Sequence, residues 1–175
     1  MSLRVFKAAC KICGDLSQAI FLGGGEPTMH PLFEQFFGIA TLTRFAEGVG
    51  VITNGTNKDI TMSLLDLARK EKIFAKLSYD THHDIRMVDN EVIDFAKKHK
   101  LINSVSKILA AGRASDWGED GCTCEDLFIA PNGDIYPCGC KITKLGNVLD
   151  KDFDIHNFKQ YLGGECEKDI LHDCE

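Results

Sequence analysis

Long apolar runs and runs of basic residues are both missing from this sequence. No apolar run approaches the roughly 18 residues that a membrane-spanning helix needs, and the amino terminus has no signal-peptide pattern. No stripe of Lys and Arg occurs, and the formal net charge is -6. Nucleic acids and anionic membranes attract positively charged proteins, so this balance excludes both as partners. We therefore expect a cytoplasmic protein that binds neither a membrane nor nucleic acid.

Cysteine, in contrast, is abundant, with eight among 175 residues. In a reducing compartment this number favours metal or iron–sulfur ligation over disulfides. The distribution is uneven, because two cysteines stand near the start and six crowd the last third: Cys10 and Cys13, then Cys122, Cys124, Cys138, Cys140, Cys166 and Cys174. The length suits one good core, so we expect a main domain at 1–115 and a cysteine-rich extension at 116–175.

Apolar periodicity predicts strands that alternate with helices. Strands are expected at 19–22, 48–53, 73–78 and 105–110, the first of them buried. Helices are expected at 2–13, from Pro31 onward, after the capping-box-like pair Thr56 and Asp59, and at 89–99. This alternation predicts an α/β fold with parallel strands, either open or forming a partial (βα) barrel.

The first predicted helix carries Cys10 and Cys13 on its apolar face and ends at Gly14. We interpret both cysteines as core residues. Near the other end of the chain, the segment LFIAPNGDIYPC has two short apolar runs around Asn132-Gly133. That pattern predicts a β-hairpin.

Small, polar or charged residues follow every predicted strand. In a parallel sheet such residues gather at the carboxyl ends of the strands, where ligands bind. They are Gly24, Gly25 and Glu26; Thr53, Asn54 and Gly55; Ser78, Asp80, His82 and His83; and Gly112 with Arg113. For Asn54-Gly55 taken alone, a tight turn is the better interpretation.

The ordered set of motifs resembles radical SAM enzymes, in particular the branch with a C-terminal SPASM or twitch extension. The resemblance covers roughly residues 15 to 145 and is specific as a set, although each motif alone is weak. Its parts are Gly-Gly-Glu-Pro at 24–27, Thr-Asn-Gly at 53–55, Ser-Tyr-Asp at 78–80, Gly-Arg-Ala at 112–114 and the cysteine-rich tail.

This resemblance implies a cofactor, S-adenosylmethionine, and a set of residues that bind it. Gly24, Gly25 and Glu26 would hold the methionine ammonium. Asn54, Ser78 and Asp80 would bind the methionine carboxylate or the ribose, and Arg113 would lie near the adenine. The complete oxidoreductase would cleave S-adenosylmethionine to a 5′-deoxyadenosyl radical, which abstracts hydrogen from a peptide or small-molecule substrate. No residue is assigned a catalytic role.

The tail also resembles the auxiliary-cluster domain of this family. Ten residues separate Cys122 from Gly133, and four more precede Cys138. The resemblance implies that Cys122, Cys124, Cys138 and Cys140 ligate an auxiliary 4Fe-4S cluster, and a hairpin would bring residues near Cys124 and Cys138 together. Zinc accepts the same thiolates, so the metal stays open.

The sequence departs from the family at its catalytic cluster, because it contains no CxxxCxxC motif. We expect either a truncated fragment, whose missing strand and cluster loop precede Met1, or a naturally cluster-free relative. In either case the chain alone is expected to be inactive. A missing strand would leave an exposed sheet edge, through which the chain could form a homo-oligomer.

Two functions of other classes stay open. A metal-dependent hydrolase could use Asp80, His82, His83, Asp84 and His30 as ligands or as a base for an activated water. Alternatively, the protein could be a non-catalytic thiolate–zinc module whose glycine-rich turn cradles a phosphate.

Overall fold

The structure is a computed structural model, and its described part divides into two compact units that are treated separately below. One unit comprises Cys13–Ser106, and the other comprises Met1–Ile12 with Lys107–Glu175. The predicted domain boundary near residue 115 lies outside the described residues and stays a prediction. The described residues are 1–16, 19–43, 48–80, 83–104, 127–137, 139, 141 and 143–157.

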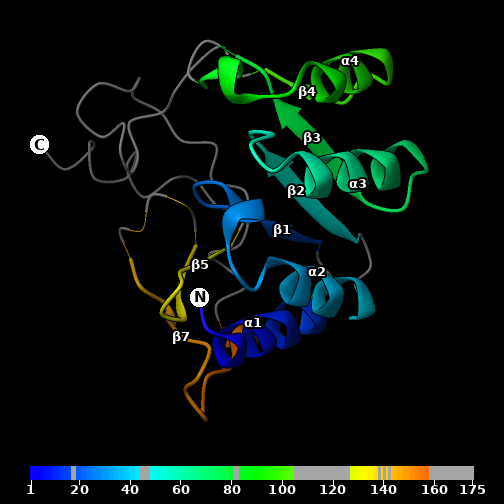
Figure 1. The fold of residues 1–175 in the computed structure, drawn as a ribbon. Helices are drawn as coiled ribbons and strands as arrows, with labels where there is room; N and C mark the ends of the chain where they lie inside the picture. Colours follow the sequence, from blue (N-terminus) through cyan, green and yellow to red (C-terminus); the bar gives the residue numbers. More distant parts are fainter. Residues whose placement is uncertain are drawn as a thin grey trace, which may run out of the picture. The chain divides into compact units, whose positions relative to one another are not determined.

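The larger unit is built on a four-stranded parallel sheet. Its strands are β1 (Ile20–Leu22), β2 (Val49–Thr53), β3 (Phe74–Ser78) and β4 (Ile102–Asn103), and they lie side by side in sequence order (Figure 1). The predicted α/β class and parallel strands are confirmed. The fourth strand of this sheet is β4, and the strand predicted at 105–110 lies outside the described residues and stays a prediction.

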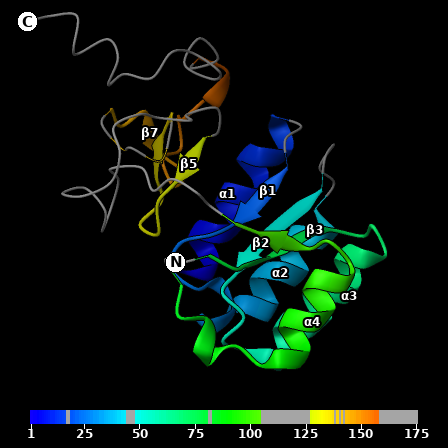
Figure 2. The ribbon, with the colours of Figure 1, turned by 90° about the horizontal axis from the view of Figure 1, so that it is seen from above.

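Three helices connect these strands and lie on the same side of the sheet (Figure 2). They are α2 (Phe33–Leu42), α3 (Lys58–Arg69) and α4 (Asn90–Lys98), with short 3-10 turns η1 (Pro27–Met29) and η2 (Ile85–Met87) before α2 and α4. This one-sided arrangement follows from the strand order, because right-handed crossovers between successive neighbours all pass over one face.

Two of the predicted helix starts are wrong in detail. The N-cap of α3 is Asn57, whose side-chain oxygen accepts a hydrogen bond from the Ile60 amide at 3.3 Å. The predicted cap residue Thr56 instead donates its hydroxyl to Asn54, because an amide oxygen two residues away offers a local turn that competes with capping. The second helix begins at Phe33 and not at Pro31, since η1 and a turn come first.

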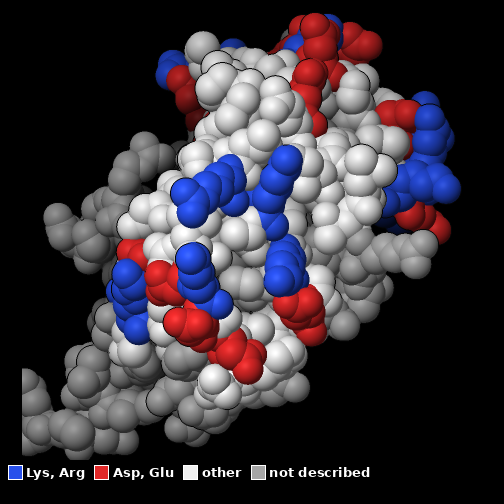
Figure 3. Space-filling model, turned by 90° about the horizontal axis from the view of Figure 1, so that it is seen from below, with Lys and Arg blue, Asp and Glu red and all other residues white. Residues whose placement is uncertain are grey.

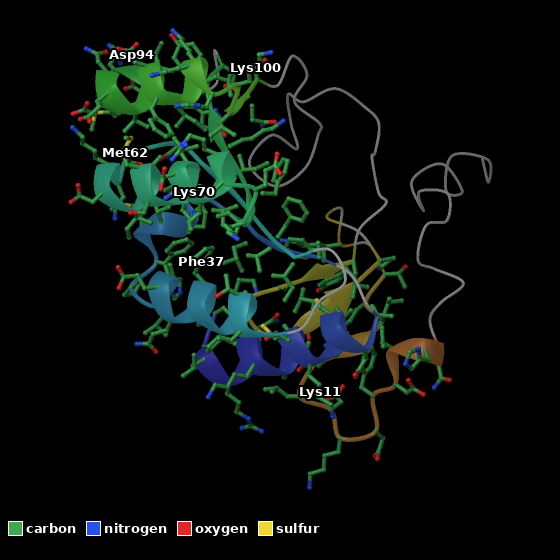
Figure 4. The ribbon with its side chains drawn as sticks, turned by 90° about the vertical axis from the view of Figure 1, so that its right-hand side faces the viewer. Lys11, Phe37, Met62, Lys70, Asp94 and Lys100 are labelled. Atoms are coloured by element: carbon green, nitrogen blue, oxygen red, sulfur yellow. The ribbon has the colours of Figure 1, made fainter. Side chains whose placement is uncertain are left out.

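The core fills the layer between the sheet and its helices (Figure 4). On this face Val51 and Ala75 pack with Phe33 and Leu64. A second cluster contains Leu65, Leu77, Val88, Val92, Ile93 and Ala96. Each fully buried Val, Leu, Ile or Phe side chain contributes about 1.5–3 kcal/mol, so the helix face holds the unit together.

The opposite face of the sheet carries exposed aromatic side chains. Phe21 is 56% exposed and Phe74 is 44% exposed. Their rings meet edge to face, 5.5 Å apart, above Gly50, where a Cβ atom would come within 2.3 Å of the Phe21 ring. The prediction of a buried strand at 19–22 is therefore wrong for Phe21, because the helices cover only the other face.

Ion pairs lie on the surface of this unit. Lys58 bridges α3 and the start of α4, with its Nζ 3.0 Å from Asp89 and 2.7 Å from Glu91. Such exposed pairs contribute little to stability. On the face drawn in Figure 3, side chains of both signs are interspersed.

Helix α1 runs over Leu3–Asp15. Its buried side chains are Val5, Phe6, Ala9, Cys10 and Ile12. Cys10 is buried, as its interpretation as a core residue requires, whereas Cys13 is only half-buried, and neither is in a disulfide. The helix continues past Gly14, where the prediction ended it, because a glycine costs only about 1 kcal/mol in a helix. No helix in the described part of the chain is long and apolar enough to span a membrane.

The smaller unit contains a three-stranded antiparallel sheet. Its strands are β5 (Phe128–Ile129), β6 (Asp134–Tyr136) and β7 (Gly146–Asn147). The predicted hairpin is confirmed: Ala130 accepts from the Gly133 amide at 2.9 Å, and Gly133 has a φ of 93°. This left-handed conformation favours glycine, as in a three-residue hairpin loop with a glycine bulge.

Candidate functional site at the carboxyl edge of the sheet

Three of the predicted strand-end segments lie at one edge of the parallel sheet. Residues 23–26 follow β1, residues 54–55 follow β2 and residues 79–80 follow β3, and these strands are neighbours. The structure therefore brings Gly24, Gly25, Glu26, Asn54, Ser78 and Asp80 to a common edge. The fourth predicted segment, with Gly112 and Arg113, lies outside the described residues.

The Glu26 carboxylate fastens the end of β1 to the end of β2. Its Oε1 accepts hydrogen bonds from the Thr53 hydroxyl at 2.7 Å, the Thr28 hydroxyl at 2.5 Å and the Thr28 amide at 3.1 Å. Its Oε2 accepts from the Asn54 amide at 2.6 Å. A carboxylate offers about four acceptor sites. Oε1 is therefore fully used, whereas Oε2 retains acceptor capacity.

Buried hydroxyls extend this network into α3. Thr53 is 1% exposed, Thr28 is 3% exposed and Thr61, in the first turn of α3, is fully buried. The hydroxyls of Thr53 and Thr61 lie 3.5 Å apart, and Thr53 also accepts from the Gly55 amide at 3.1 Å. Buried hydroxyls require partners. Sequence reasoning missed Thr28 and Thr61, although a threonine next to the Gly-Gly-Glu-Pro segment was a visible signal.

The glycine turn before Glu26 is open. Gly24 and Gly25 have φ values of 93° and 60°, and a Cβ atom at Gly23, Gly24 or Gly25 would meet no atom of a described residue within 4 Å. These backbone angles are left-handed and favour glycine. The three glycines are exposed, and none of their backbone groups bonds to another residue in the described part. Within the described part of the chain, their exposed amides and carbonyls are thus available to a ligand, next in sequence to a carboxylate.

The side chains after β2 and β3 are less accessible than this turn. The Oδ1 of Asn54 accepts from the Thr56 amide at 3.0 Å, which leaves its amide nitrogen as the group for a ligand. Ser78 is 7% exposed. The Asp80 side chain is 5% exposed, and its Oδ1 lies 2.8 Å from Nδ1 of His83. Roles for Asn54, Ser78 and Asp80 in binding a ligand stay predictions.

The residues of the alternative hydrolase site divide into two groups. Asp80 and His83 contact each other, with 2.8 Å between Oδ1 and Nδ1, whereas His30 and Asp84 have other partners. His30 accepts from the Leu32 amide through Nδ1 at 3.1 Å, and Asp84 pairs with Arg86, whose guanidinium lowers the pKa of that carboxyl. His82 lies outside the described residues. Among those that are described, no group of three His, Cys, Asp or Glu side chains could hold a metal ion.

The four predicted metal ligands of the tail, Cys122, Cys124, Cys138 and Cys140, lie outside the described residues. What is described next to them is the hairpin, which pairs Phe128 with Tyr136. The ligand set stays a prediction.

No family model, curated protein or solved structure matches this chain.

Proposed function

We propose that this protein binds S-adenosylmethionine at the carboxyl edge of its parallel sheet and belongs to the radical SAM lineage. The observation that carries the proposal is the open glycine turn at Gly24 and Gly25, held next to the Glu26 carboxylate. A primary ammonium has three donors and a positive charge, and exposed carbonyls beside a carboxylate are suitable partners for it.

The residues at this edge fit the cofactor in kind. Gly24 and Gly25 would accept from the methionine ammonium through their carbonyls, and Glu26 would supply the neighbouring negative charge with capacity left on Oε2. Asn54, Ser78 and Asp80 would bind the methionine carboxylate or the ribose, and Arg113, which lies outside the described residues, would lie near the adenine. In a complete enzyme, one electron from the catalytic 4Fe-4S cluster would cleave the bound cofactor to methionine and a 5′-deoxyadenosyl radical, and that radical would abstract hydrogen from a substrate.

The sheet is consistent with a partial (βα) barrel. Four strands in sequence order, with every helix of that unit on one face, form a singly wound layer. A doubly wound fold would instead reverse its strand order and place helices on both faces. The face opposite these helices, with Phe21 and Phe74, would then be the interior side of the barrel, and the edge at β1 could pair with a second chain.

For the tail, we propose that Cys122, Cys124, Cys138 and Cys140 ligate an auxiliary 4Fe-4S cluster, with zinc as the alternative metal. The antiparallel hairpin supports this, because it begins and ends next to the two cysteine pairs in sequence.

Calorimetric titration of the protein with S-adenosylmethionine tests the binding proposal. The variant Gly24→Ala adds a methyl group to a residue at φ 93°, which costs about 1–2 kcal/mol of backbone strain. We expect the dissociation constant to rise about tenfold. The matched control is Gly23→Ala, which adds the same methyl group in the same turn without a left-handed φ. Absence of binding by the wild-type protein, or equal affinity of the two variants, would contradict the proposal.

The tail proposal is tested by metal analysis after anaerobic reconstitution. Iron, acid-labile sulfide and zinc are measured per chain for the wild-type protein and for Cys122→Ala/Cys138→Ala. We expect iron and sulfide in the wild-type protein and their loss in the variant. If the wild-type protein contains only zinc, the tail holds a thiolate–zinc site and no cluster. If iron persists in the variant, Cys122 and Cys138 are not its ligands.

A further inference from the structure

We propose that Glu26 is a positioning residue, which sets the shape of the glycine turn so that ligand contacts are made by the backbone of Gly24 and Gly25. This inference deepens the proposed function and rests on it where it concerns affinity for S-adenosylmethionine. Its geometric part, the fastening of the turn to β2, stands on the described hydrogen bonds alone.

Strand β2 holds the glycine turn at two points. Before the turn, Leu22 pairs with Val51 in the parallel ladder. After the turn, the Glu26 carboxylate reaches Thr53 and Asn54. Three glycines span these two points, and their exposed backbone makes no other hydrogen bond in the described part of the chain. The Glu26 carboxylate is therefore the attachment to β2 that lies nearest the end of the turn, and two residues later the Asn57 side-chain amide donates to the Thr28 carbonyl at 3.5 Å.

The protein orients the Glu26 carboxylate before any ligand arrives. Four protein donors bind it, two of them hydroxyls of residues that are at least 97% buried. Bonds to a charged acceptor are stronger than those between neutral groups. Turning the carboxylate toward a ligand would leave the Thr28 and Thr53 hydroxyls buried without this partner, which is unfavourable.

The groups of the glycine turn that the protein leaves unused indicate the chemical class of the ligand. With the Glu26 carboxylate held by the protein, the groups left for direct contact with a ligand are the carbonyls and amides of the turn, next to the negative charge of that carboxylate. Such a set takes a donor-rich cation, such as a primary ammonium. We expect that an analogue of S-adenosylmethionine without its α-amino group binds more weakly.

The experiment separates positioning from direct contact by changing the partners of the carboxylate. Thr53→Val removes the hydroxyl at constant shape and leaves Glu26 in place, whereas Thr53→Ser keeps a hydroxyl. If Glu26 acts through the turn, Thr53→Val and Glu26→Gln both raise the dissociation constant for S-adenosylmethionine on the order of tenfold, as loss of supporting contacts does elsewhere. Thr53→Ser restores most of the affinity. Two exposed positions of α2 provide the matched controls, which are Glu34→Gln and Thr41→Val.

A second measurement needs no ligand. The amide resonances of Gly23, Gly24 and Gly25 are recorded for each variant of the free protein, together with its urea unfolding midpoint. We expect the chemical shifts of these amides to change in Thr53→Val and Glu26→Gln, and to be the same as in the wild-type protein in both controls. Should Thr53→Val fail to fold, Thr28→Val removes the other hydroxyl.

The outcomes distinguish this inference from the proposed function. Unmoved turn resonances in the folded Thr53→Val and Glu26→Gln variants overturn the positioning role. Weaker binding by Glu26→Gln with unchanged binding by Thr53→Val makes Glu26 a direct ligand, which also overturns it. If the wild-type protein does not bind S-adenosylmethionine, the proposed function fails, and the turn resonances still decide the role of Glu26.

Discussion

Replacing Gly55 by alanine tests whether the loop after β2 is held by packing as well as by hydrogen bonds. Gly55 is buried and has a φ of 80°. A Cβ atom there would lie 2.7 Å from Cδ1 of Leu77 and 2.8 Å from Cγ1 of Val88. Both neighbours are buried members of the core cluster between the sheet and α4. The new methyl group would therefore press into a filled core.

Three contributions set the size of the effect. The left-handed backbone costs an alanine about 1–2 kcal/mol, and overpacking of a filled core costs about 1–3 kcal/mol. The reduced entropy of the unfolded chain offsets about 0.4–1 kcal/mol of this. We expect Gly55→Ala to lower the free energy of unfolding by about 2–4 kcal/mol, a large part of the roughly 5–15 kcal/mol typical of a domain.

Urea unfolding followed by circular dichroism measures this loss. The midpoint should fall while the dependence on urea stays constant, because the surface exposed on unfolding does not change. The matched control is Gly38→Ala in α2, where the new Cβ meets no atom within 4 Å and φ is not left-handed. That variant should be slightly stabilised, by up to about 1 kcal/mol. A loss below about 1 kcal/mol for Gly55→Ala would refute the reasoning.

Two further predictions concern the pKa of Asp134 in the hairpin and the cleavage of S-adenosylmethionine. The Lys144 ammonium, with Asn147 and Asn132, lowers the pKa of Asp134, so this carboxylate stabilises the fold above its ordinary pKa near 4 and loses that contribution as pH falls through the lowered value. In Lys144→Met, a carboxyl NMR titration should show the pKa of Asp134 closer to the ordinary value, and an unchanged pKa would disprove the pairing. Because the sequence contains no CxxxCxxC motif, the reconstituted chain with dithionite should form no 5′-deoxyadenosine from S-adenosylmethionine, and turnover would contradict that prediction.

Much of the fold could be predicted because its signals are local. Apolar periods set the strands and helices, and Asn132-Gly133 set the hairpin. Placement of the strand-end segments at a common edge followed from the parallel sheet, which the alternation of elements implies. What could not be predicted depends on contacts between distant residues. The exposure of Phe21 depends on which face the helices cover, and the sequence of β1 alone does not contain that information.

In the candidate site, too, local motifs could be predicted and contacts between distant residues could not. Gly24, Gly25 and Glu26 were visible as a motif, and their place at the end of β1 is confirmed. The partners of Glu26 were not visible, because Thr53 lies 27 residues away and threonines at a strand end have many structural uses. Strand β7, with only Gly146 and Asn147, has no apolar pattern that a periodicity argument could detect.

The sequence-order arrangement of the parallel sheet also bears on how the chain can assemble. From Ile20 to Val49, from Gly50 to Phe74 and from Leu77 to Ile102, the chain advances 29, 24 and 25 residues between paired positions. Doubling the length of a closed loop costs only about 0.6 kcal/mol of entropy, so these three closures are nearly equivalent. No pairing in this sheet has to wait for a distant segment. Folding can start at any pair of neighbouring strands and proceed from there in either direction.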